Sequence, residues 1–305
     1  MEASWRAVLI TAIAPIAWGA TYYVTHLLLP AEAPLWGSAL RALPAGIVLL
    51  LIARRLPRGI QWARSALLGL LNVGGLFLLL YLAAQLLPTS VASSIMAASP
   101  LVLALFAWAL AGQQPAARMF AGAAIGILGV LLLVAGGVGA IEPWGVAASA
   151  AALVSSSLGF VLTKRWGATA APVAESAWQL LAGGLMLLVV ALFVEGPPPV
   201  LDAGGWIGIA YVTLIGTALA NVAWFYGLEH LKAGTVGIIG LLNPVTGVLL
   251  GVLLGGESLA AAQLAGILLV LVGILIGQQR LRRGRAPEPV EERPRSGRVS
   301  KPTEP

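Results

Sequence analysis

Long apolar stretches separated by short polar connections make up almost the whole chain, from its beginning to about residue 278. Each stretch holds about 20 residues, the length that a helix needs to cross the hydrocarbon core of a bilayer. The pattern predicts ten such helices, at residues 7–29, 34–53, 65–86, 89–111, 117–136, 143–163, 172–193, 205–226, 234–254 and 260–278. The expected fold is therefore an all-α integral membrane protein with ten transmembrane helices.

The positions of lysine and arginine predict the orientation of these helices. Positively charged connections remain on the cytoplasmic side of a membrane. With a cytoplasmic N-terminus, 17 of the 18 basic residues fall in inner segments, and the other one, Arg41, lies within a helix. The outer connections, around Glu32, Pro88, Glu142, 195–202 and Glu257, contain no basic residue. An error of one helix would destroy this separation, so we expect both termini in the cytoplasm.

The two halves of the chain resemble each other. A shift of 144 residues aligns Pro100 with Pro244, Gly122 with Gly266 and Gly129 with Gly273, and a shift of 138 aligns Arg41 with Gln179. Each half has five predicted helices. Because five is odd, the second half must enter the membrane from the opposite side, which gives two inverted repeats around a central cavity. Inverted repeats are a recurrent design of secondary transporters.

The repeats give the expected domain boundaries. Residues 1–137 form the first five-helix repeat and residues 138–279 form the second. Residues 280–305 are rich in Arg, Pro and Glu and have too few apolar residues to fold alone, so we expect a disordered basic cytoplasmic tail.

Composition excludes several classes of protein. Apolar residues make up 59% of the chain and charged residues 10%, against roughly 25% charged in a soluble domain. Although the net charge is +6, the basic residues lie between apolar stretches and not on a polar surface, so we expect no nucleic-acid partner. Two histidines and no cysteine offer no metal cluster, and no GxxxxGK[ST] loop is present. We expect no metal, no cofactor and no enzymatic activity, and a membrane-embedded hydrolase or transferase is the less favoured alternative.

Several local patterns resemble the drug/metabolite transporter superfamily, in its EamA-type ten-helix branch. They are Trp18-Gly19, the stretch 41–46 (RALPAG), and two half-repeat signatures. Each signature has a midspan proline after a small or amide residue (Ser99-Pro100, Asn243-Pro244) and a later Gly-Gln or Gly-Glu pair (Gly112-Gln113, Gly256-Glu257). The resemblance covers about residues 5–278, and Gln113 departs from the glutamate of the usual pattern.

This resemblance implies export of small metabolites across a bacterial inner membrane by a multi-pass protein. The chain looks most similar to exporters of amino acids, aromatic ones included. Carried over position by position, the resemblance favours Tyr81, Ser99, Ser155 and Gly240 as residues of the substrate cavity.

Polar and aromatic side chains at midspan depth are the other candidates for the cavity. Hydroxyl and amide groups orient an amphipathic zwitterion and aromatic rings pack its side chain, although such residues also join helices to one another. The candidate set is Trp18, Tyr22, Arg41, Tyr81, Ser99, Ser155, Trp178, Asn221, Gly240 and Asn243.

Two further features concern mechanism. Four midspan prolines, Pro15, Pro44, Pro100 and Pro244, each remove a backbone hydrogen bond, so they are candidate hinges or simple kinks. Arg41 is a charge inside a span, which is costly by about 2.5–3.5 kcal/mol on insertion scales. It reaches water, forms a salt bridge with a neighbour, or binds a substrate carboxylate.

The sequence thus predicts an inner-membrane secondary transporter that exports small metabolites, amino acids above all, by alternating access. A flippase or exporter of lipid-linked or other metabolites remains the alternative. The expected partners are the small-molecule substrate and the lipid bilayer, and the protein is a monomer or a homodimer.

Overall fold

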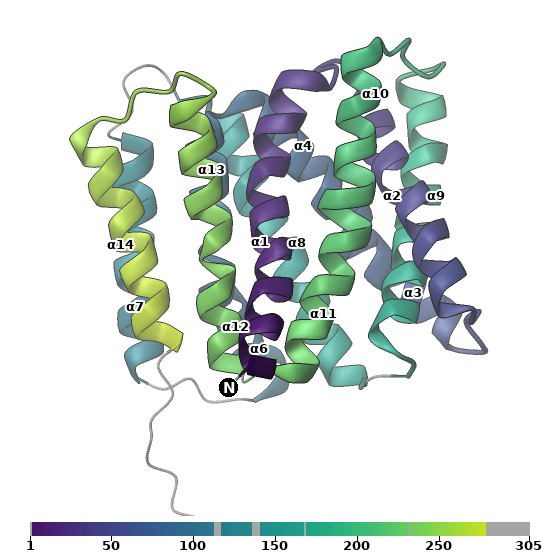
Figure 1. Cartoon of the computed structure of the whole chain (residues 1–305), viewed down its shortest axis with the longest axis horizontal. Coiled ribbons are helices and arrows are strands. Elements are labelled where there is room, and N and C mark those ends of the chain that lie inside the picture. The colour runs from purple at the N-terminus through teal and green to yellow at the C-terminus, as the bar shows by residue number, and fades with distance from the viewer. Residues whose placement is uncertain (1, 113–116, 136–140, 168, 232, 279–305) are drawn as a thin grey trace, which may run out of the picture.

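The computed structural model describes residues 2–112, 117–135, 141–167, 169–231 and 233–278, which form helices and contain no strand (Figure 1). The first half contains α1 (Glu2–Leu28), α2 (Pro34–Ala53), α3 (Gln61–Gly69), η1 (Leu70–Gly75), α4 (Leu76–Leu86), α5 (Thr89–Met96), α6 (Ser99–Ala111) and α7 (Ala117–Ala135). The second contains α8 (Pro143–Trp166), α9 (Pro172–Val194), α10 (Ala203–Ala210), η2 (Tyr211–Leu219), α11 (Ala220–His230), α12 (Ala233–Gly240), α13 (Leu242–Leu253) and α14 (Ala261–Gln278). The expected tail, residues 280–305, lies outside the described residues.

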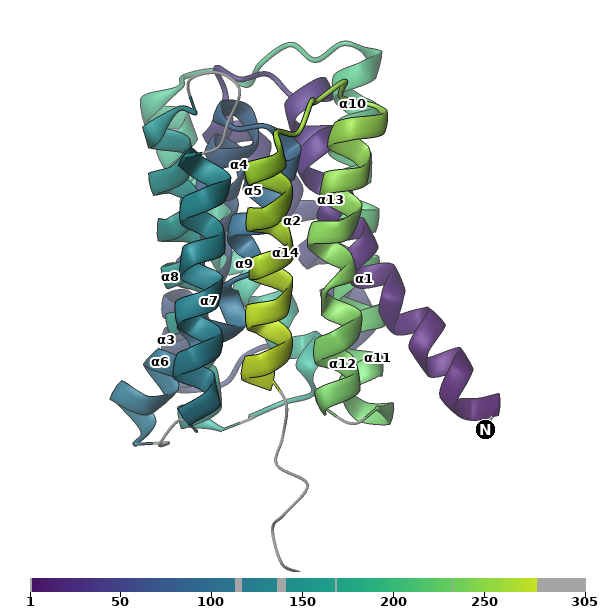
Figure 2. The same ribbon diagram turned by 90° about the vertical axis from the view of Figure 1, so that its left-hand side faces the viewer.

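Seven helical stretches of the described chain are long and apolar enough to cross a membrane: Trp5–Leu28, Pro34–Ala53, Gln61–Leu86, Thr89–Leu110, Pro143–Trp166, Pro172–Val194 and Ala203–His230. Phe120–Leu133, Ile238–Leu253 and Ala261–Gly277 are shorter apolar helices. The helices pack side by side in one bundle, with α7 and α14 at one edge and α2 and α9 at the opposite edge (Figures 1 and 2).

The charged connections separate between the two ends of this bundle (Figure 1). The basic end, where α1 begins and α2, α8 and α11 end, carries Arg6, Arg54, Arg55, Arg58, Arg64, Arg118, Lys164 and Arg165, together with Glu175 and Glu229. The acidic end carries Glu32, Glu142, Glu195, Asp202 and Glu257. α1 begins and α14 ends at the basic end.

Irregular backbone occurs at matching places in the two halves. The third predicted helix of each half contains a π-helical segment, η1 or η2, and the fourth is broken into two pieces. The breaks follow Met96 and Gly240, which are 144 residues apart. These are the residues whose carbonyls Pro100 and Pro244 leave without their helical donor. Pro15 and Pro44, in contrast, lie inside continuous helices.

Reciprocal glycine contacts join α7 to α14, which lie side by side in both views (Figure 2). A Cβ added at Gly122 would collide with the carbonyl oxygen of Gly273, and one at Gly129 would lie 2.7 Å from the carbonyl oxygen of Gly266. The 144-residue shift moves Gly122 to Gly266 and Gly129 to Gly273. The two contacts therefore occupy equivalent positions of the two halves. Small residues at such a face let the two backbones approach closely.

The helices α2 and α9 repeat this reciprocity at the other edge. A Cβ at Gly46 would lie 2.9 Å from Leu181, and a Cβ at Gly184 would lie 2.9 Å from Leu43. The 138-residue shift converts one contact into the other. The contact of α1 with α11 likewise corresponds to that of α8 with α4 when the halves are exchanged, with shifts of 138 residues for α1 and 144 for α4.

Two glutamates at the acidic end each hold the first turn of a helix from the other half. Glu257 accepts hydrogen bonds from the backbone N–H of Thr89 (2.6 Å) and Ser90 (3.2 Å), and from the Ser90 hydroxyl. Glu195 accepts from the N–H groups of Leu35 (2.8 Å) and Trp36 (3.0 Å). Carboxylates satisfy the free N–H groups of a helix start and favour its dipole.

Replacing Glu257 with alanine is expected to destabilise the protein by about 2–3 kcal/mol, because three hydrogen bonds to a charged acceptor are lost at α5. Thermal unfolding in detergent measures the change. Glu142, which accepts one long bond of 3.5 Å from its own helix start, is the matched control, and its alanine variant is expected to stay close to wild type. Equal stability of the two variants would contradict the capping role.

Candidate functional site

A buried arginine lies where the two halves meet. Arg41 is the eighth residue of α2, about 10 Å inside the acidic end at 1.5 Å per residue. Only 8% of its surface is accessible. Its Nε donates a hydrogen bond to Thr217 Oγ1 (2.9 Å), and its Nη2 donates to the Gly216 carbonyl oxygen (3.4 Å). Both acceptors belong to η2 of the other half.

The π-helical backbone of η2 makes these acceptors available. The Thr217 hydroxyl donates to the Val212 carbonyl oxygen five residues earlier (2.7 Å), so its oxygen presents a lone pair to Arg41. Single π-turns inside helices occur often at functional sites, because they release backbone groups from the regular ladder. Gly216 and Thr217 are both buried, so a donor from a neighbouring helix satisfies them.

One aromatic ring contacts the guanidinium, and two tyrosines lie near it. Its Cζ lies 4.1 Å from the ring centroid of Phe77 on α4, a cation–π contact. Tyr22 on α1 and Tyr211 on η2 lie within electrostatic range, and Tyr211 donates to the Ala17 carbonyl oxygen (3.2 Å). We call Tyr22, Arg41, Phe77, Tyr211 and Thr217 the Arg41 site.

The Arg41 site has the chemistry of an anion receptor with aromatic walls. A guanidinium has five N–H donors, and two of them have a hydrogen-bond partner among the described residues. No carboxylate of the described chain forms an ion pair with it. A carboxylate matches the planar donor fork of arginine in two parallel hydrogen bonds. The neighbouring rings suit the apolar body of the same ligand.

Gln179 on α9 occupies the matching place in the other half, as the 138-residue shift predicts. Its Oε1 accepts a hydrogen bond of 2.9 Å from Nδ2 of Asn72 in η1, so each of Arg41 and Gln179 contacts the π-helical segment of the opposite repeat. The Asn72 Oδ1 is buried and has no partner among the described residues. Arg41 and Gln179 therefore occupy equivalent places in the two halves, but only Arg41 carries a charge.

A second group of candidates meets beside the break between α12 and α13. The rings of Trp18 and Trp224 lie 5.3 Å apart, and a Cβ at Gly240 would lie 3.5 Å from Trp224. A Cβ at Gly19 would collide with the Asn243 carbonyl oxygen, while the Asn243 Oδ1 is buried without a partner. Trp18, Gly240 and Asn243 are thus brought together.

Within the described chain, three of the remaining polar candidates bond to a different segment, and the other two do not. Tyr81 donates to the Pro30 carbonyl oxygen (2.7 Å), Trp178 Nε1 to that of Arg55 (2.8 Å), and Ser155 to that of Leu71 (2.7 Å). Asn221 bonds the Thr217 carbonyl oxygen in the preceding turn (2.8 Å), and Ser99 begins α6. Among the hinge candidates, Pro15 and Pro244 are buried and Pro44 faces outward.

Phe77 and Tyr211 of the Arg41 site were not among the sequence candidates, and neither was Gly216, whose carbonyl oxygen accepts from Arg41. A signal for Tyr211 exists, since it is an aromatic residue with a polar group inside the eighth predicted helix. Phe77 and Gly216 carry no such signal, because an apolar ring and a glycine are ordinary in a membrane helix.

Comparison with known proteins supports the architecture. The EamA-like transporter family matches residues 5–135 and 143–277. Protein PecM of Dickeya dadantii is 36% identical over 87% of this chain and 90% of its own length. The uncharacterized inner membrane transporter YedA of Escherichia coli K12 is 28% identical over 86% of this chain and 87% of its own, and the uncharacterized transporter YvbV of Bacillus subtilis is 24% identical over 89% and 91%.

A crystal structure of another protein has the same fold, with a TM-score of 0.62 at 20% identity over 89% of this chain and 96% of that one. The helical spans, the family match over nearly the whole chain and the relative at 36% identity agree with one another. The chain is a multi-pass membrane protein and belongs to the EamA-like transporter family of the drug/metabolite transporter superfamily.

Proposed function

We propose that the protein exports amino acids, aromatic ones included, across a bacterial inner membrane, and that Arg41 binds the substrate carboxylate. The observation that carries the proposal is the buried Arg41 guanidinium, which has free donors, aromatic neighbours and no acidic partner in the described chain. An unpaired charge at this depth is costly, which makes it a functional candidate by default.

The proposed mechanism is alternating access by two inverted five-helix repeats, residues 1–137 and 138–279. The reciprocal glycine contacts of α7 with α14, and of α2 with α9, support a two-fold axis in the membrane plane. Because Arg41 contacts η2 of the other repeat, a relative movement of the repeats changes the surroundings of the guanidinium. The basic end of the bundle is then cytoplasmic, as the distribution of arginine and lysine favours.

Counterflow in proteoliposomes tests this function. Vesicles preloaded with a mixture of unlabelled amino acids are expected to accumulate labelled tryptophan transiently, without an imposed gradient, because a carrier exchanges one substrate for another. Labelled threonine and leucine define the range of substrates. Protein-free vesicles are the control. Folded protein that exchanges no amino acid would contradict the proposal and favour a lipid-linked or other metabolite.

A further inference from the structure

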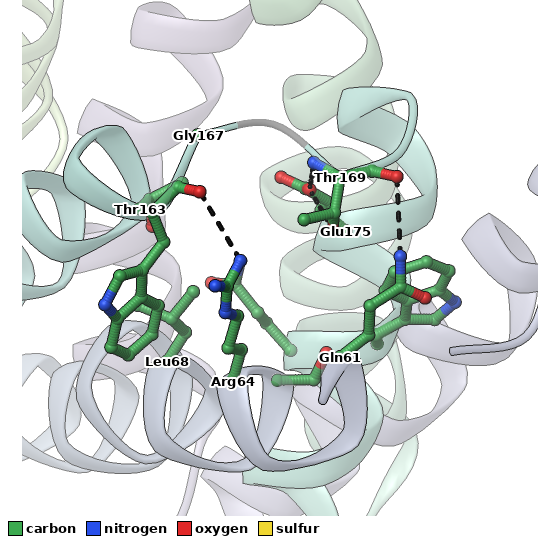
Figure 3. Close-up of a pocket in the computed structure, with 11 residues that line it drawn as sticks. Gln61, Arg64, Leu68, Thr163, Gly167, Thr169 and Glu175 are labelled. Atoms are coloured by element: carbon green, nitrogen blue, oxygen red, sulfur yellow. Dashed lines mark hydrogen bonds between the residues drawn. The ribbon is translucent and has the colours of Figure 1, made fainter. Parts of the chain in front are cut away.

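A small pocket lies at the basic end between α3, α8 and α9, and charged, polar and aromatic side chains line it (Figure 3). We call it the inner pocket, and its lining includes Gln61, Arg64, Trp166, Glu175, Trp178 and Gln179. The space open to the centre of a water-sized sphere is about 20 Å³, which is room for about one water molecule. In this conformation the inner pocket is therefore closed to a metabolite.

Two opposite charges reach the inner pocket from different helices. Arg64 extends from α3 toward the end of α8, where its Nη1 donates to the carbonyl oxygen of Trp166 at 3.4 Å (Figure 3). Its guanidinium lies 5.5 Å from the Trp166 ring centroid. This one long hydrogen bond is the only one that the Arg64 side chain makes with the described residues, so most of its donors remain free.

Glu175 lies in the first turn of α9 and has one oxygen engaged. Its Oε1 accepts from the N–H (2.7 Å) and hydroxyl (2.9 Å) of Thr169 and from the N–H of Ala170 (3.2 Å). Its Oε2 accepts no hydrogen bond from the described residues. Arg64 and Glu175 form no ion pair in the described structure, although they line the same pocket. The inner pocket thus presents one cationic and one anionic side chain that are not paired with each other.

We infer that the inner pocket is a second binding site, which receives the zwitterionic head of an amino acid from the cytoplasm before it reaches Arg41. Arg64 binds the carboxylate and the Oε2 of Glu175 binds the ammonium group. The rings of Trp166 and Trp178 face the side chain of the substrate. This inference rests on the proposed function, because it takes the basic end as cytoplasmic and the substrate as an amino acid.

Two long side-chain hydrogen bonds cross the mouth of the inner pocket. Gln61 Nε2 donates to the Thr169 carbonyl oxygen at 3.4 Å, and the Arg64–Trp166 bond has the same length (Figure 3). Both lie beyond the usual range of 2.7–3.2 Å. Their release frees the side chains of Gln61 and Arg64 at the mouth of the inner pocket, while the close contact of Gly69 with Gly183 keeps α3 packed on α9. Gln179, the counterpart of Arg41, lines the inner pocket and bonds Asn72 of η1, so an opened pocket leads toward the centre of the bundle.

The test compares an amino acid with its deaminated acid in oriented proteoliposomes. Glu175→Gln keeps an Oε1 acceptor for Thr169 and removes the negative charge. It is expected to raise the KM for tryptophan supplied at the basic end about tenfold, and to leave the KM for indole-3-propionate unchanged. Arg64→Gln is expected to raise both KM values at the basic end, and neither at the acidic end. Arg58→Gln is the matched control, since Arg58 is an exposed arginine at the same end.

The outcomes separate this site from the proposed function. If wild-type protein exchanges tryptophan while the Glu175 variant changes the KM of both compounds equally, or of neither, the inner pocket is not a zwitterion site. Arg64→Gln effects of equal size at the two ends would also overturn the inference. If wild-type protein exchanges no amino acid, the proposed function fails first. Thermal unfolding of each variant in detergent verifies that it is folded.

Discussion

Replacing Arg41 with methionine is expected to reduce amino-acid exchange about a hundredfold with little change in the stability of the protein. A charge-assisted hydrogen-bond pair to a carboxylate contributes about 3 kcal/mol, which corresponds to a factor of about 100 in affinity. Removal of a buried charge without an acidic partner relieves a desolvation penalty but leaves the buried acceptors of Gly216 and Thr217 without their donor, so the melting temperature is expected to change little. Counterflow of labelled tryptophan and thermal unfolding measure the two quantities.

Arg41→Lys separates charge from geometry. Lysine keeps the positive charge but lacks the planar fork, so an intermediate loss of about tenfold is expected. Arg58→Met, at an exposed position of the basic end, is the control for removal of an arginine and is expected to exchange normally. Loss of exchange together with a collapse of stability in Arg41→Met would assign Arg41 a structural role instead.

Leucine at Gly122 is expected to prevent the close contact of α7 with α14, with a loss of several kcal/mol and of most folded protein. Even the Cβ of alanine at this position collides with the Gly273 carbonyl oxygen, and backbone cannot move aside as a flexible side chain does. Alanine alone is therefore expected to destabilise by about 1–3 kcal/mol. The yield of monodisperse protein and its thermal unfolding in detergent report the effect.

The symmetry of the contact gives this prediction a sharper form. Gly122→Ala and Gly266→Ala occupy equivalent positions in the two repeats and are expected to destabilise the protein by similar amounts. Gly204→Ala, whose Cβ would meet its nearest neighbour at an ordinary 3.4 Å, is expected to be neutral. A large effect at one of the paired glycines and none at the other would contradict a reciprocal interface.

Hydropathy predicted where the helices lie but not which way their side chains point. The range predicted for the second helix, 34–53, agrees with α2 at both ends, and the expected Arg41 position lies inside it. The rotation of a helix about its axis depends on the helices packed around it. For that reason the contacts of Tyr81 with Pro30 and of Trp178 with Arg55 could not be read from spacing.

The repeat was the most informative signal in the sequence. Aligned glycines and prolines correspond to reciprocal contacts and to matching helix breaks, because each reflects a close approach or a missing donor in the backbone. The π-helical segments η1 and η2 have no comparable signal, since Asn72 of η1 and the threonines of η2 show polar positions but not the change in helix type. Thr217 is a polar residue of the eighth predicted helix, but its pairing with Arg41 and the role of the Gly216 carbonyl oxygen were visible only in three dimensions.

The most direct test of the central claim is whether the Arg41 site opens to each side of the membrane in turn. The chain has no cysteine, so Ser38→Cys introduces a single thiol on α2, one turn from Arg41 and buried. A membrane-impermeant thiol reagent is applied to one face of oriented vesicles, with and without tryptophan. Labelling from each face, slowed by tryptophan in both cases, is the expected result. Labelling from one face only, or a rate that tryptophan does not change, would contradict an alternating-access carrier with its substrate at Arg41.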